Sequence, residues 1–257
     1  MMAKTKSARL ILAVLAYLLM PLAAFAAEPV DLLLVLSADI SRSLDQAKFQ
    51  LQRDGYAAAL SSPRVLQAIQ SGPHRKIAIC FVEWSGSTAQ KLVIDWAVIA
   101  DEASAKNFAA AIVEAPRAFF DRTSISGGID FAMAQLERAP YTAKRRIIDI
   151  SGDGTHNSGR DVREARDEAI AKGVIINGIV ILTANPMPWN PEHTNPPGGL
   201  QKYYENNVIG GPSSFAMAAE NFESFGKALT QKLIAEIAAL PPPHQAASLS
   251  RSRMVAE

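Results

Sequence analysis

Cysteine is almost absent from this 257-residue sequence. Cys80 is the only one, so the chain cannot form an internal disulfide and has no cysteine pair for a zinc site. It lies in the apolar run Lys76-Ile-Ala-Ile-Cys-Phe-Val82, which predicts a buried strand with the thiol as a small core side chain. No cysteine follows the N-terminal apolar segment at a cleavage position, which argues against a lipid-anchored lipoprotein.

An excess of positive charge is also missing. The chain has 26 Lys and Arg against 25 Asp and Glu, a formal net charge of +1. Without Lys4, Lys6 and Arg9 the balance is 23 − 25 = −2. Neither value provides a basic surface for nucleic acid or for an anionic membrane, so we expect neither partner.

The first 26 residues have the organisation of a secretory signal peptide. The three basic residues precede an apolar stretch from Leu10 to Leu22, and Ala24-Phe25-Ala26 offers the small-x-small site that signal peptidase needs. The stretch is short for a membrane span, although an uncleaved anchor is the alternative. Cleavage leaves 257 − 26 = 231 residues, which we expect in the periplasm or outside the cell.

Short apolar runs alternate with longer segments of helical periodicity, a pattern that predicts an α/β fold with a mostly parallel central sheet. The turn Ser85-Gly-Ser87 should make the second and third strands antiparallel, and helices should cover both faces. We expect one domain over residues 27–240 and a disordered tail over 241–257, because Pro241-Pro-Pro243 ends the last helix. The predicted strands are 30–37, 76–84, 90–96, 146–150 and 174–182, and the predicted helices are about 44–60, 101–115, 126–137, 161–172 and 221–240.

The interval 183–200 interrupts this alternation. It contains five prolines, two glycines and Trp189, without a helical or strand period. Long irregular loops in compact domains are usually functional or mobile. Two interpretations stay open: a solvated insertion, or a segment that helps to select a binding partner.

Three loops combine polar residues with positions at the carboxyl ends of predicted strands, where open α/β sheets bind ligands. Asp39, Ser41 and Ser43 follow the first strand, Thr123 precedes a middle helix, and Asp153 ends the fourth strand. All five side chains offer oxygen, which suits a hard divalent cation such as Mg²⁺. Zinc fits poorly, because no cysteine or histidine pair has ligand spacing.

Each of these motifs alone has an ordinary structural explanation. Asp and Ser before a helix are common N-caps, Thr123 with Ser124 could be another cap, and Asp-Gly after a strand is a common turn. The combination of all three is much less common by chance. The combination therefore favours a ligand-binding site over separate helix caps and turns.

At this point the chain resembles the von Willebrand factor type A domain with its metal-ion-dependent adhesion site. The resemblance extends from about Val30 to Leu240 and is greatest to secreted bacterial members of unassigned function. The runs that carry it are Phe81-Val-Glu-Trp-Ser-Gly86, Thr123-Ser-Ile-Ser-Gly127, Ile148-Asp-Ile-Ser-Gly-Asp-Gly154 and Val208-Ile-Gly-Gly-Pro212.

The resemblance implies a Rossmann-like fold and a role for each loop residue. Ser41, Ser43 and Thr123 would present hydroxyls to the metal, and Asp39 and Asp153 would hold it directly or through water. Mg²⁺ is the expected ion, with Mn²⁺ or Ca²⁺ as alternatives, and a carboxylate of a protein or acidic ligand would fill the last position. The family often has glycine where this chain has Arg42. A cation there either weakens metal binding or steers an acidic partner.

Several other residues are candidates for the rim of such a site. Glu83 and Trp84 end the second strand near the same face, His156 lies three residues after Asp153, and Trp189 lies in the irregular loop. The alternatives are a packing aromatic beside a loop-anchoring carboxylate for Glu83 and Trp84, and a surface or loop-packing role for His156. His74, His193 and His244 are scattered in loop or tail contexts.

Enzymatic interpretations find less support. Ser151-Gly-Asp-Gly-Thr-His-Asn157 resembles the acidic metal loop of haloacid-dehalogenase phosphatases, with Asp39 as nucleophile. Those enzymes use a second Asp as general acid where this chain has Ser41, and a hydroxyl cannot replace it near neutral pH. Gly-x-Ser-x-Gly, His-Glu-x-x-His and a phosphate-binding loop are all absent from the sequence.

We therefore predict a secreted, non-enzymatic domain that binds its partner through a metal. A metal-free structural domain, in which the site residues merely cap helices, is the remaining alternative.

Overall fold

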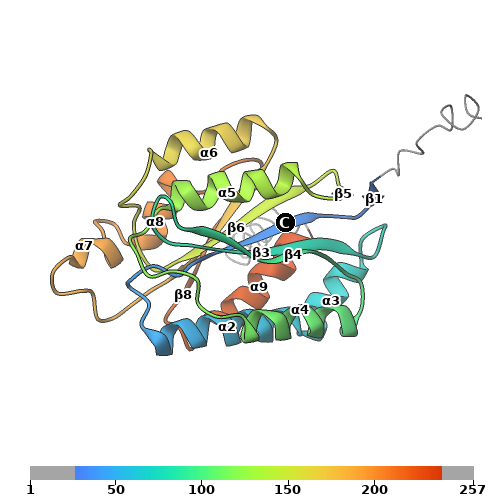
Figure 1. The fold of residues 1–257 in the computed structure, drawn as a ribbon, viewed down its shortest axis with the longest axis horizontal. Helices are drawn as coiled ribbons and strands as arrows, with labels where there is room; N and C mark the ends of the chain where they lie inside the picture. The colour runs from blue at the N-terminus through green and yellow to red at the C-terminus, as the bar shows by residue number, and fades with distance from the viewer. Residues whose placement is uncertain (1–26, 239–257) are drawn as a thin grey trace, which may run out of the picture.

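The computed structural model describes residues 27–238 and is built on a six-stranded sheet (Figure 1). The strand order is β4-β3-β2-β6-β7-β8. The predicted signal peptide and the 241–257 tail lie outside the described residues. The strands are β2 (Leu33–Asp39), β3 (Ile77–Trp84), β4 (Gln90–Ile99), β6 (Arg146–Gly152), β7 (Ile175–Ile181) and β8 (Ala216–Ala219), and a separate parallel pair joins β1 (Glu28–Pro29) to β5 (Tyr141–Thr142).

The sheet is parallel except at one edge. β4 pairs antiparallel with β3, whereas the other neighbours in the sheet run parallel. The turn at residues 85–87 allows the chain to return directly, while every parallel pair needs a helical crossover. The predicted fold class, mostly parallel with one antiparallel edge strand, is confirmed.

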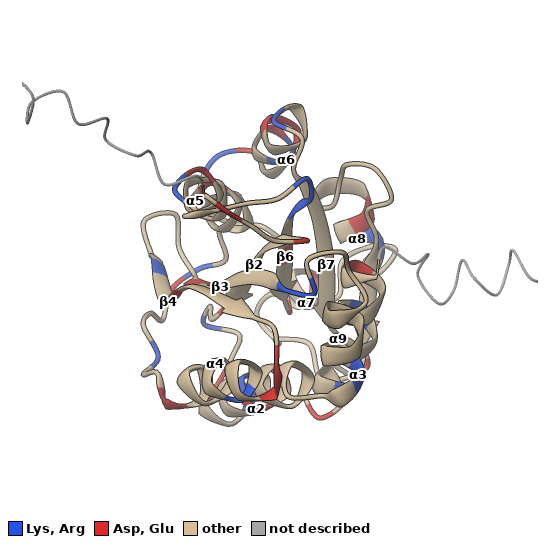
Figure 2. Ribbon diagram, turned by 90° about the vertical axis from the view of Figure 1, so that its right-hand side faces the viewer, with Lys and Arg blue, Asp and Glu red and all other residues tan. Residues whose placement is uncertain are grey.

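Helices cover both faces of the sheet (Figure 2). Leu34 and Leu36 of β2 point to one face, and Leu33 and Val35 point to the other, because successive side chains of a strand alternate. The first face packs against α2 (Gln46–Leu60), α3 (Pro63–Gln70), α4 (Glu102–Glu114) and α9 (Phe225–Ile237), and the second against α5 (Ile125–Glu137), α6 (Val162–Ala171) and α8 (Leu200–Asn207).

The single cysteine is a core residue, as the sequence predicts. Cys80 is fully buried in β3 among the apolar side chains of the second face. Burial raises the pKa of its thiol, which keeps it protonated and unreactive.

Several elements differ from the sequence prediction. Helices α3 and α8 and strand β8 were not predicted, and the interval 183–200 contains a short helix, α7 (Pro191–Thr194). β8 has the sequence Ala-Met-Ala-Ala, which lacks the β-branched and aromatic residues typical of strands, and it forms only through its pairing with β7. The predicted apolar stripe of α2 was partly wrong: Ala47 and Ala58 are exposed, whereas Gln52 and Arg53 are buried.

Two groups of charged side chains are buried in the first face. Arg53 of α2 pairs with Glu83 of β3 at 2.5 Å. Lys232 of α9 lies 2.6 Å from Asp149 of β6 and also pairs with Glu236. Within residues 27–238, no helix is long and apolar enough to cross a bilayer.

Candidate metal centre

Three separate loops meet at the carboxyl ends of β2 and β6. Asp39 is the last residue of β2, Asp153 directly follows β6, and Thr123 lies two residues before α5. β2 and β6 are neighbours in the sheet, with Ala38 opposite Ser151. The topology therefore brings together residues that are up to 114 positions apart in the sequence.

None of the five predicted residues caps a helix. The N-cap of α2 is Asp45, whose side chain accepts a hydrogen bond from the backbone N–H of Lys48. Ser124 caps α5 and Asp161 caps α6 in the same way. Capping thus does not explain why polar side chains stand at these five positions.

The three hydroxyls form a continuous series that ends on a carboxylate. Thr123 Oγ1 donates to Ser41 Oγ at 3.0 Å, and Ser41 Oγ lies 3.1 Å from Ser43 Oγ. Ser43 Oγ donates to Asp153 Oδ1 at 2.5 Å. These contacts join four side-chain oxygens from all three loops in one series.

The carboxyl groups of Asp39 and Asp153 are both buried, and they repel each other. Burial raises the pKa of Asp39 well above its usual range, and repulsion from Asp153 raises it further. Burial also raises the pKa of Asp153, against the hydrogen bond from Ser43. Asp39 Oδ1 accepts the Ser41 N–H at 2.7 Å, but Asp39 Oδ2 has no hydrogen-bond partner in the described part of the chain.

A glycine keeps the space beside these carboxyl groups open. A Cβ atom on Gly152 would lie 2.4 Å from Tyr204 Oη and 3.2 Å from Asp39 Oδ2. Any larger residue at this position would push the tyrosine or Asp39 out of place. The glycine that ends β6, between Ser151 and Asp153, therefore has a steric reason.

An arginine outside the predicted set anchors the first loop. Arg117 donates to the backbone carbonyls of Ile40, Ser41 and Leu44 at 2.8, 2.9 and 2.9 Å. Its guanidinium also lies 4.9 Å from the ring centroid of Phe120. A single side chain thus fixes the backbone on both sides of Ser41 and Ser43.

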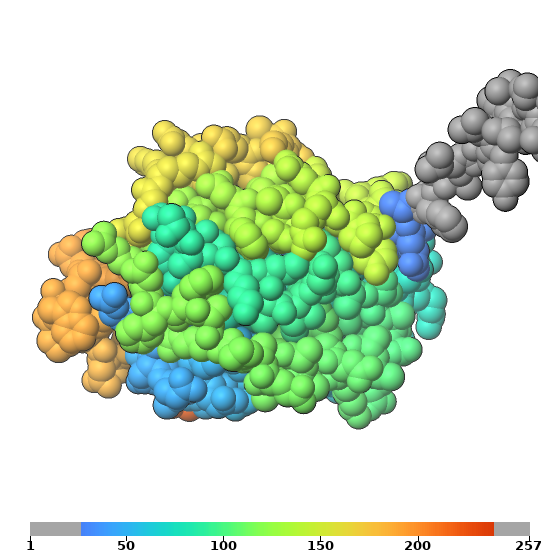
Figure 3. All heavy atoms as spheres, in the orientation of Figure 1, coloured from blue at the N-terminus to red at the C-terminus, as the bar shows by residue number. Residues whose placement is uncertain are grey.

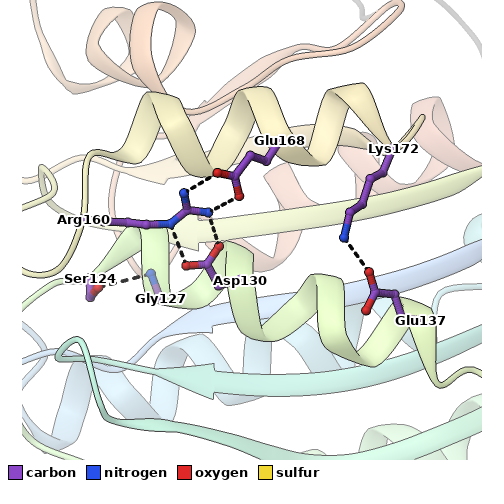
Figure 4. A network of polar contacts seen from close by, with 7 residues as sticks. All are labelled: Ser124, Gly127, Asp130, Glu137, Arg160, Glu168 and Lys172. Carbon is purple, nitrogen blue, oxygen red and sulfur yellow. Dashed lines mark hydrogen bonds and ion pairs between the residues drawn. The ribbon is translucent and has the colours of Figure 1, made fainter.

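The third loop is attached to α5 and α6. Asn157 and Thr123 bond reciprocally, because the Asn157 N–H donates to Thr123 O and the Thr123 N–H donates to Asn157 Oδ1, both at 2.9 Å. Figure 4 shows Arg160 between Asp130 of α5 and Glu168 of α6, with paired hydrogen bonds of 2.6–3.0 Å to both carboxylates. The loop after Asp153 is therefore fixed at both ends.

A hollow adjoins the centre, and the irregular loop forms one of its walls. In Figure 3 the orange loop lies against blue and yellow-green segments at the left end of the molecule. Arg42 and Trp189, two of the predicted rim residues, are among the residues that line this hollow. Its other lining residues are Ser43, Asp121, Arg122, Thr123, Asn157, Met187, Asn190 and His193.

Glu83 and Trp84 are not rim residues, and that prediction was wrong. Both are 0% exposed. Glu83 turns into the first face toward Arg53, and Trp84 packs on the second face against Gly128 of α5, where a Cβ would lie 2.8 Å from its ring. Helices on both faces cover the end of β3, so the packing alternative holds for this pair.

His156 does not line the hollow either. Its backbone N–H donates to Tyr203 Oη at 3.2 Å, and its ring is half-buried. Sequence reasoning instead missed His193, which is 4% exposed and whose Nε2 lies 3.3 Å from Thr123 Oγ1. Burial lowers the pKa of His193. Its only sequence signal was its position in the irregular interval.

No cluster of three or more His, Cys, Asp or Glu side chains suited to a metal occurs in residues 27–238. A metal at the centre would therefore depend on hydroxyl ligands as well as on Asp39 and Asp153.

Comparison with known proteins identifies a family. The model of the family described as "Protein of unknown function (DUF1194)" matches residues 29–241. No protein among those with curated descriptions matches the chain.

Solved structures with this fold come from distant proteins. A pilus adhesin, SpaC of Lactobacillus rhamnosus GG, is 13% identical with a TM-score of 0.56 over 82% of this chain and 31% of its own. The mussel byssus proximal thread matrix protein 1, with a zinc-occupied MIDAS motif, is 17% identical with a TM-score of 0.53 over 83% and 48%. A von Willebrand factor type A protein from Catenulispora acidiphila is 12% identical with a TM-score of 0.53 over 82% and 42%.

This chain therefore spans about a third to a half of the length of these structures, and at such identities the likeness concerns the fold alone. The family match covers most of the sequence, and the expected resemblance is confirmed. The chain belongs to the family of proteins of unknown function DUF1194, and its fold is that of a von Willebrand factor type A domain.

Proposed function

We propose that this protein is a periplasmic or secreted, non-enzymatic domain that binds an acidic partner through a divalent cation. Asp39, Ser41, Ser43, Thr123 and Asp153 would hold the ion. The observation that carries the proposal is Asp39 Oδ2, a buried carboxylate oxygen that has no hydrogen-bond partner within residues 27–238 and lies beside a second buried carboxylate. Leaving such groups uncompensated is costly, and a cation between them would remove the cost.

The donor spacing supports this assignment. Two ligands on neighbouring vertices of an octahedron, each about 2.1 Å from Mg²⁺, are about 3.0 Å apart. The separations of 3.0 Å between Thr123 and Ser41 and 3.1 Å between Ser41 and Ser43 agree with this value. Mg²⁺ is the expected ion, and Mn²⁺ or Ca²⁺ use the same oxygen ligands.

Two carboxylates would balance a dication, and hydroxyl ligands would add no charge. The bound ion would supply an electrophilic position that accepts a carboxylate from outside. The chain's own residues determine access to it: Ser43 is part-exposed at the hollow, whereas Asp39, Ser41 and Thr123 are buried.

The surface around the hollow favours a partner that is acidic and partly apolar. Arg42 and Arg122 place two guanidinium groups on its lining. Of the large hydrophobic side chains in residues 27–238, only three are exposed, and two of these, Phe120 at 58% and Trp189 at 80%, lie on loops next to the site. The ring of Phe120 is 5.8 Å from the Arg42 guanidinium carbon. Arg42 is itself exposed, so its charge faces solvent, which favours the steering role.

The alternatives agree less well with the structure. A phosphatase of the haloacid-dehalogenase type would need a carboxyl group where Ser41 lies, and its nucleophile, Asp39, is 0% exposed. A metal-free domain held together by caps is disfavoured because Asp45, Ser124 and Asp161 provide the caps.

Retention on an acidic resin tests the proposal. At 0.15 M salt, the protein should bind immobilised poly-glutamate in millimolar Mg²⁺ or Mn²⁺ and elute with a chelator. Asp39→Ala should not be retained under either condition. Equal retention of the wild type with and without chelator would show that the arginines alone attract the resin, and would contradict a metal-dependent site.

A further inference from the structure

One buried side chain attaches an irregular loop to the candidate metal centre. The loop spans residues 182–199, between β7 and α8, and contains α7. His193 of α7 is 4% exposed, whereas Trp189 earlier in the loop is 80% exposed. A Cβ atom on Gly154 would lie 2.3 Å from His193 Nε2, so the glycine after Asp153 leaves the space that the imidazole occupies.

The neighbours of the ring determine which of its nitrogens carries the proton. Asn157 Oδ1 accepts the Thr123 N–H at 2.9 Å, which fixes the orientation of the amide and leaves Asn157 Nδ2 beside the ring. This Nδ2 lies 3.5 Å from His193 Nδ1 and can only donate. Thr155 Oγ1, 3.2 Å from the same nitrogen, can donate as well. Nδ1 is therefore the acceptor, and the neutral ring carries its proton on Nε2.

This proton fixes the hydroxyl of Thr123. Nε2–H donates to Thr123 Oγ1 at 3.3 Å, and Oγ1 donates its own proton to Ser41 Oγ at 3.0 Å. A hydroxyl has one proton and two lone pairs, so one lone pair of Oγ1 remains for an ion. Two hydrogen bonds, to two different loops, thus determine how Thr123 presents its oxygen.

The imidazole is also the first donor of a longer series. Beyond Ser41 the series continues to Ser43 and Asp153, with 3.1 Å between the two serine oxygens and 2.5 Å from Ser43 Oγ to Asp153 Oδ1. The backbone of α7 has a separate attachment, because the Thr155 N–H donates to the His193 carbonyl at 2.8 Å. Removal of the ring should therefore disturb the hydroxyls while the backbone of the loop stays attached.

We propose that His193 is a positioning residue of the metal centre. Its Nε2–H orients the hydroxyl of Thr123, and its ring attaches the loop that carries Trp189 to the loops that carry the metal ligands. The inference rests on the proposed function and makes it more specific: the ion and Trp189 belong to one binding surface, which a partner contacts with a carboxylate and an apolar group together. His193 itself does not bind the ion.

Calorimetric titration of the full protein with Mg²⁺ measures the positioning role. His193→Ala should bind Mg²⁺ about tenfold more weakly, a loss typical of residues that orient a metal ligand. His193→Gln should recover most of that affinity, because its amide N–H can replace Nε2–H as the donor. Asn195, exposed and two residues further along the same loop, provides the matched control Asn195→Ala, which should bind as the wild type does.

A double-mutant cycle separates this role from a general effect on packing. Thr123→Val removes the hydroxyl that His193 orients. If His193 acts through Thr123, the double variant should bind Mg²⁺ no more weakly than Thr123→Val alone. The urea-unfolding midpoint of metal-free His193→Ala establishes that the variant folds. His193→Asn, whose amide is too short to reach Thr123, replaces it in the cycle if it does not.

Nuclear magnetic resonance tests the tautomer without any metal. In a long-range ¹H–¹⁵N spectrum at about pH 8, where an imidazole is neutral, the His193 signals should show the proton on Nε2. The signals are identified by their absence from the spectrum of His193→Gln. A proton on Nδ1 would overturn the inference.

The outcomes distinguish the two proposals. Equal Mg²⁺ affinity of the wild type and His193→Ala, or additive losses in the double variant, would overturn the inference and leave the proposed function intact. Non-additive losses, together with loss of Mg²⁺ binding in Asp39→Ala, would support both. Absence of any divalent-cation binding in the wild type would overturn both.

Discussion

Arg117 lies outside the metal centre, yet it determines the shape of the first loop. Its guanidinium holds three carbonyls between Ile40 and Leu44, and these belong to the segment that carries Ser41 and Ser43. Lysine has a single ammonium group and cannot reproduce a planar fork of donors.

Arg117→Lys should therefore loosen this loop more than it destabilises the protein. Loss of two or three charge-assisted hydrogen bonds on a half-exposed side chain should cost about 1–3 kcal/mol of unfolding free energy. Metal affinity should fall by roughly tenfold, as for other residues that orient ligands. Calorimetry and urea unfolding measure the two effects; unchanged metal affinity at reduced stability would exclude a positioning role.

Glu236 belongs to a second buried group of charged side chains, which includes none of the five proposed metal ligands. One ammonium, Lys232, faces the carboxyl groups of Asp149 and Glu236, all buried, and Asn177 donates to Glu236 Oε1 at 2.7 Å. Burial, with repulsion from Asp149, raises the pKa of Glu236 from 4.5 to about 7.

A carboxyl group with a raised pKa in the folded state stabilises the fold at low pH. That contribution is complete below pH 4.5 and is lost as the pH rises through about 7. Between these values the wild type should lose on the order of 3 kcal/mol, a loss that Glu236→Gln should not show. Unfolding free energies of both proteins at pH 4.5 to 8 measure this, with exposed Asp167→Asn as control; parallel curves for all three would contradict the assignment.

At the level of elements, two helices of the first face approach each other through glycines. Gly55 of α2 and Gly226 of α9 are in contact: a Cβ on Gly226 would lie 3.0 Å from Gly55 Cα, and one on Gly55 would lie 2.5 Å from the Phe225 ring. The close approach lets Tyr56 and Phe225 pack edge to face, with ring centroids 5.2 Å apart.

Gly55→Ala should thus destabilise the protein, although alanine is the better helix former. Overpacking should cost about 1–3 kcal/mol, against a gain of about 1 kcal/mol at an open helical position. Denaturant unfolding measures the change. An increase in stability would contradict the prediction, because it would mean that α2 and α9 can move apart without a loss of unfolding free energy.

The loop that contains α7 carries an exposed aromatic side chain, Trp189, which leads to a prediction about the partner. With metal present, the protein should bind an immobilised glutamate–tyrosine copolymer more tightly than poly-glutamate, because Trp189 and Phe120 can pack on the aromatic rings. Trp189→Ala should abolish the difference, whereas Val113→Ala, at an exposed site on α4, should not. Equal retention of wild type and Trp189→Ala on both resins would remove Trp189 from partner recognition.

At the scale of the whole molecule, the sequence predicts the strands, turns and helices that depend on local residue patterns. Long apolar runs such as Ile77–Trp84 specify buried strands, and the short turn at 85–87 specifies the antiparallel edge. The proximity of Asp39 and Asp153 follows from parallel strands that end at one edge of the sheet. β8 and His193 could not be predicted, because β8 forms only through tertiary pairing and His193 reaches the centre from a loop without periodicity.

The burial of a polar side chain is the second feature that the sequence does not predict. Glu83 is charged and Trp84 ends its strand, so their sequence is compatible with a surface position, yet helices on both faces cover them. Arg53 explains how the carboxylate is tolerated, and this partner comes from a helix thirty residues earlier.

Thermal unfolding with and without divalent cations tests the central claim most directly. The protein is unfolded first with chelator and then with Mg²⁺, Mn²⁺ or Ca²⁺ at millimolar concentration, alongside Asp39→Ala. An ion at 100 times its dissociation constant stabilises by about 2.7 kcal/mol, so the wild-type midpoint should rise by a few degrees while the midpoint of the variant stays constant. A wild-type midpoint that no cation raises, or an equal rise in Asp39→Ala, would contradict a metal centre at this end of the sheet.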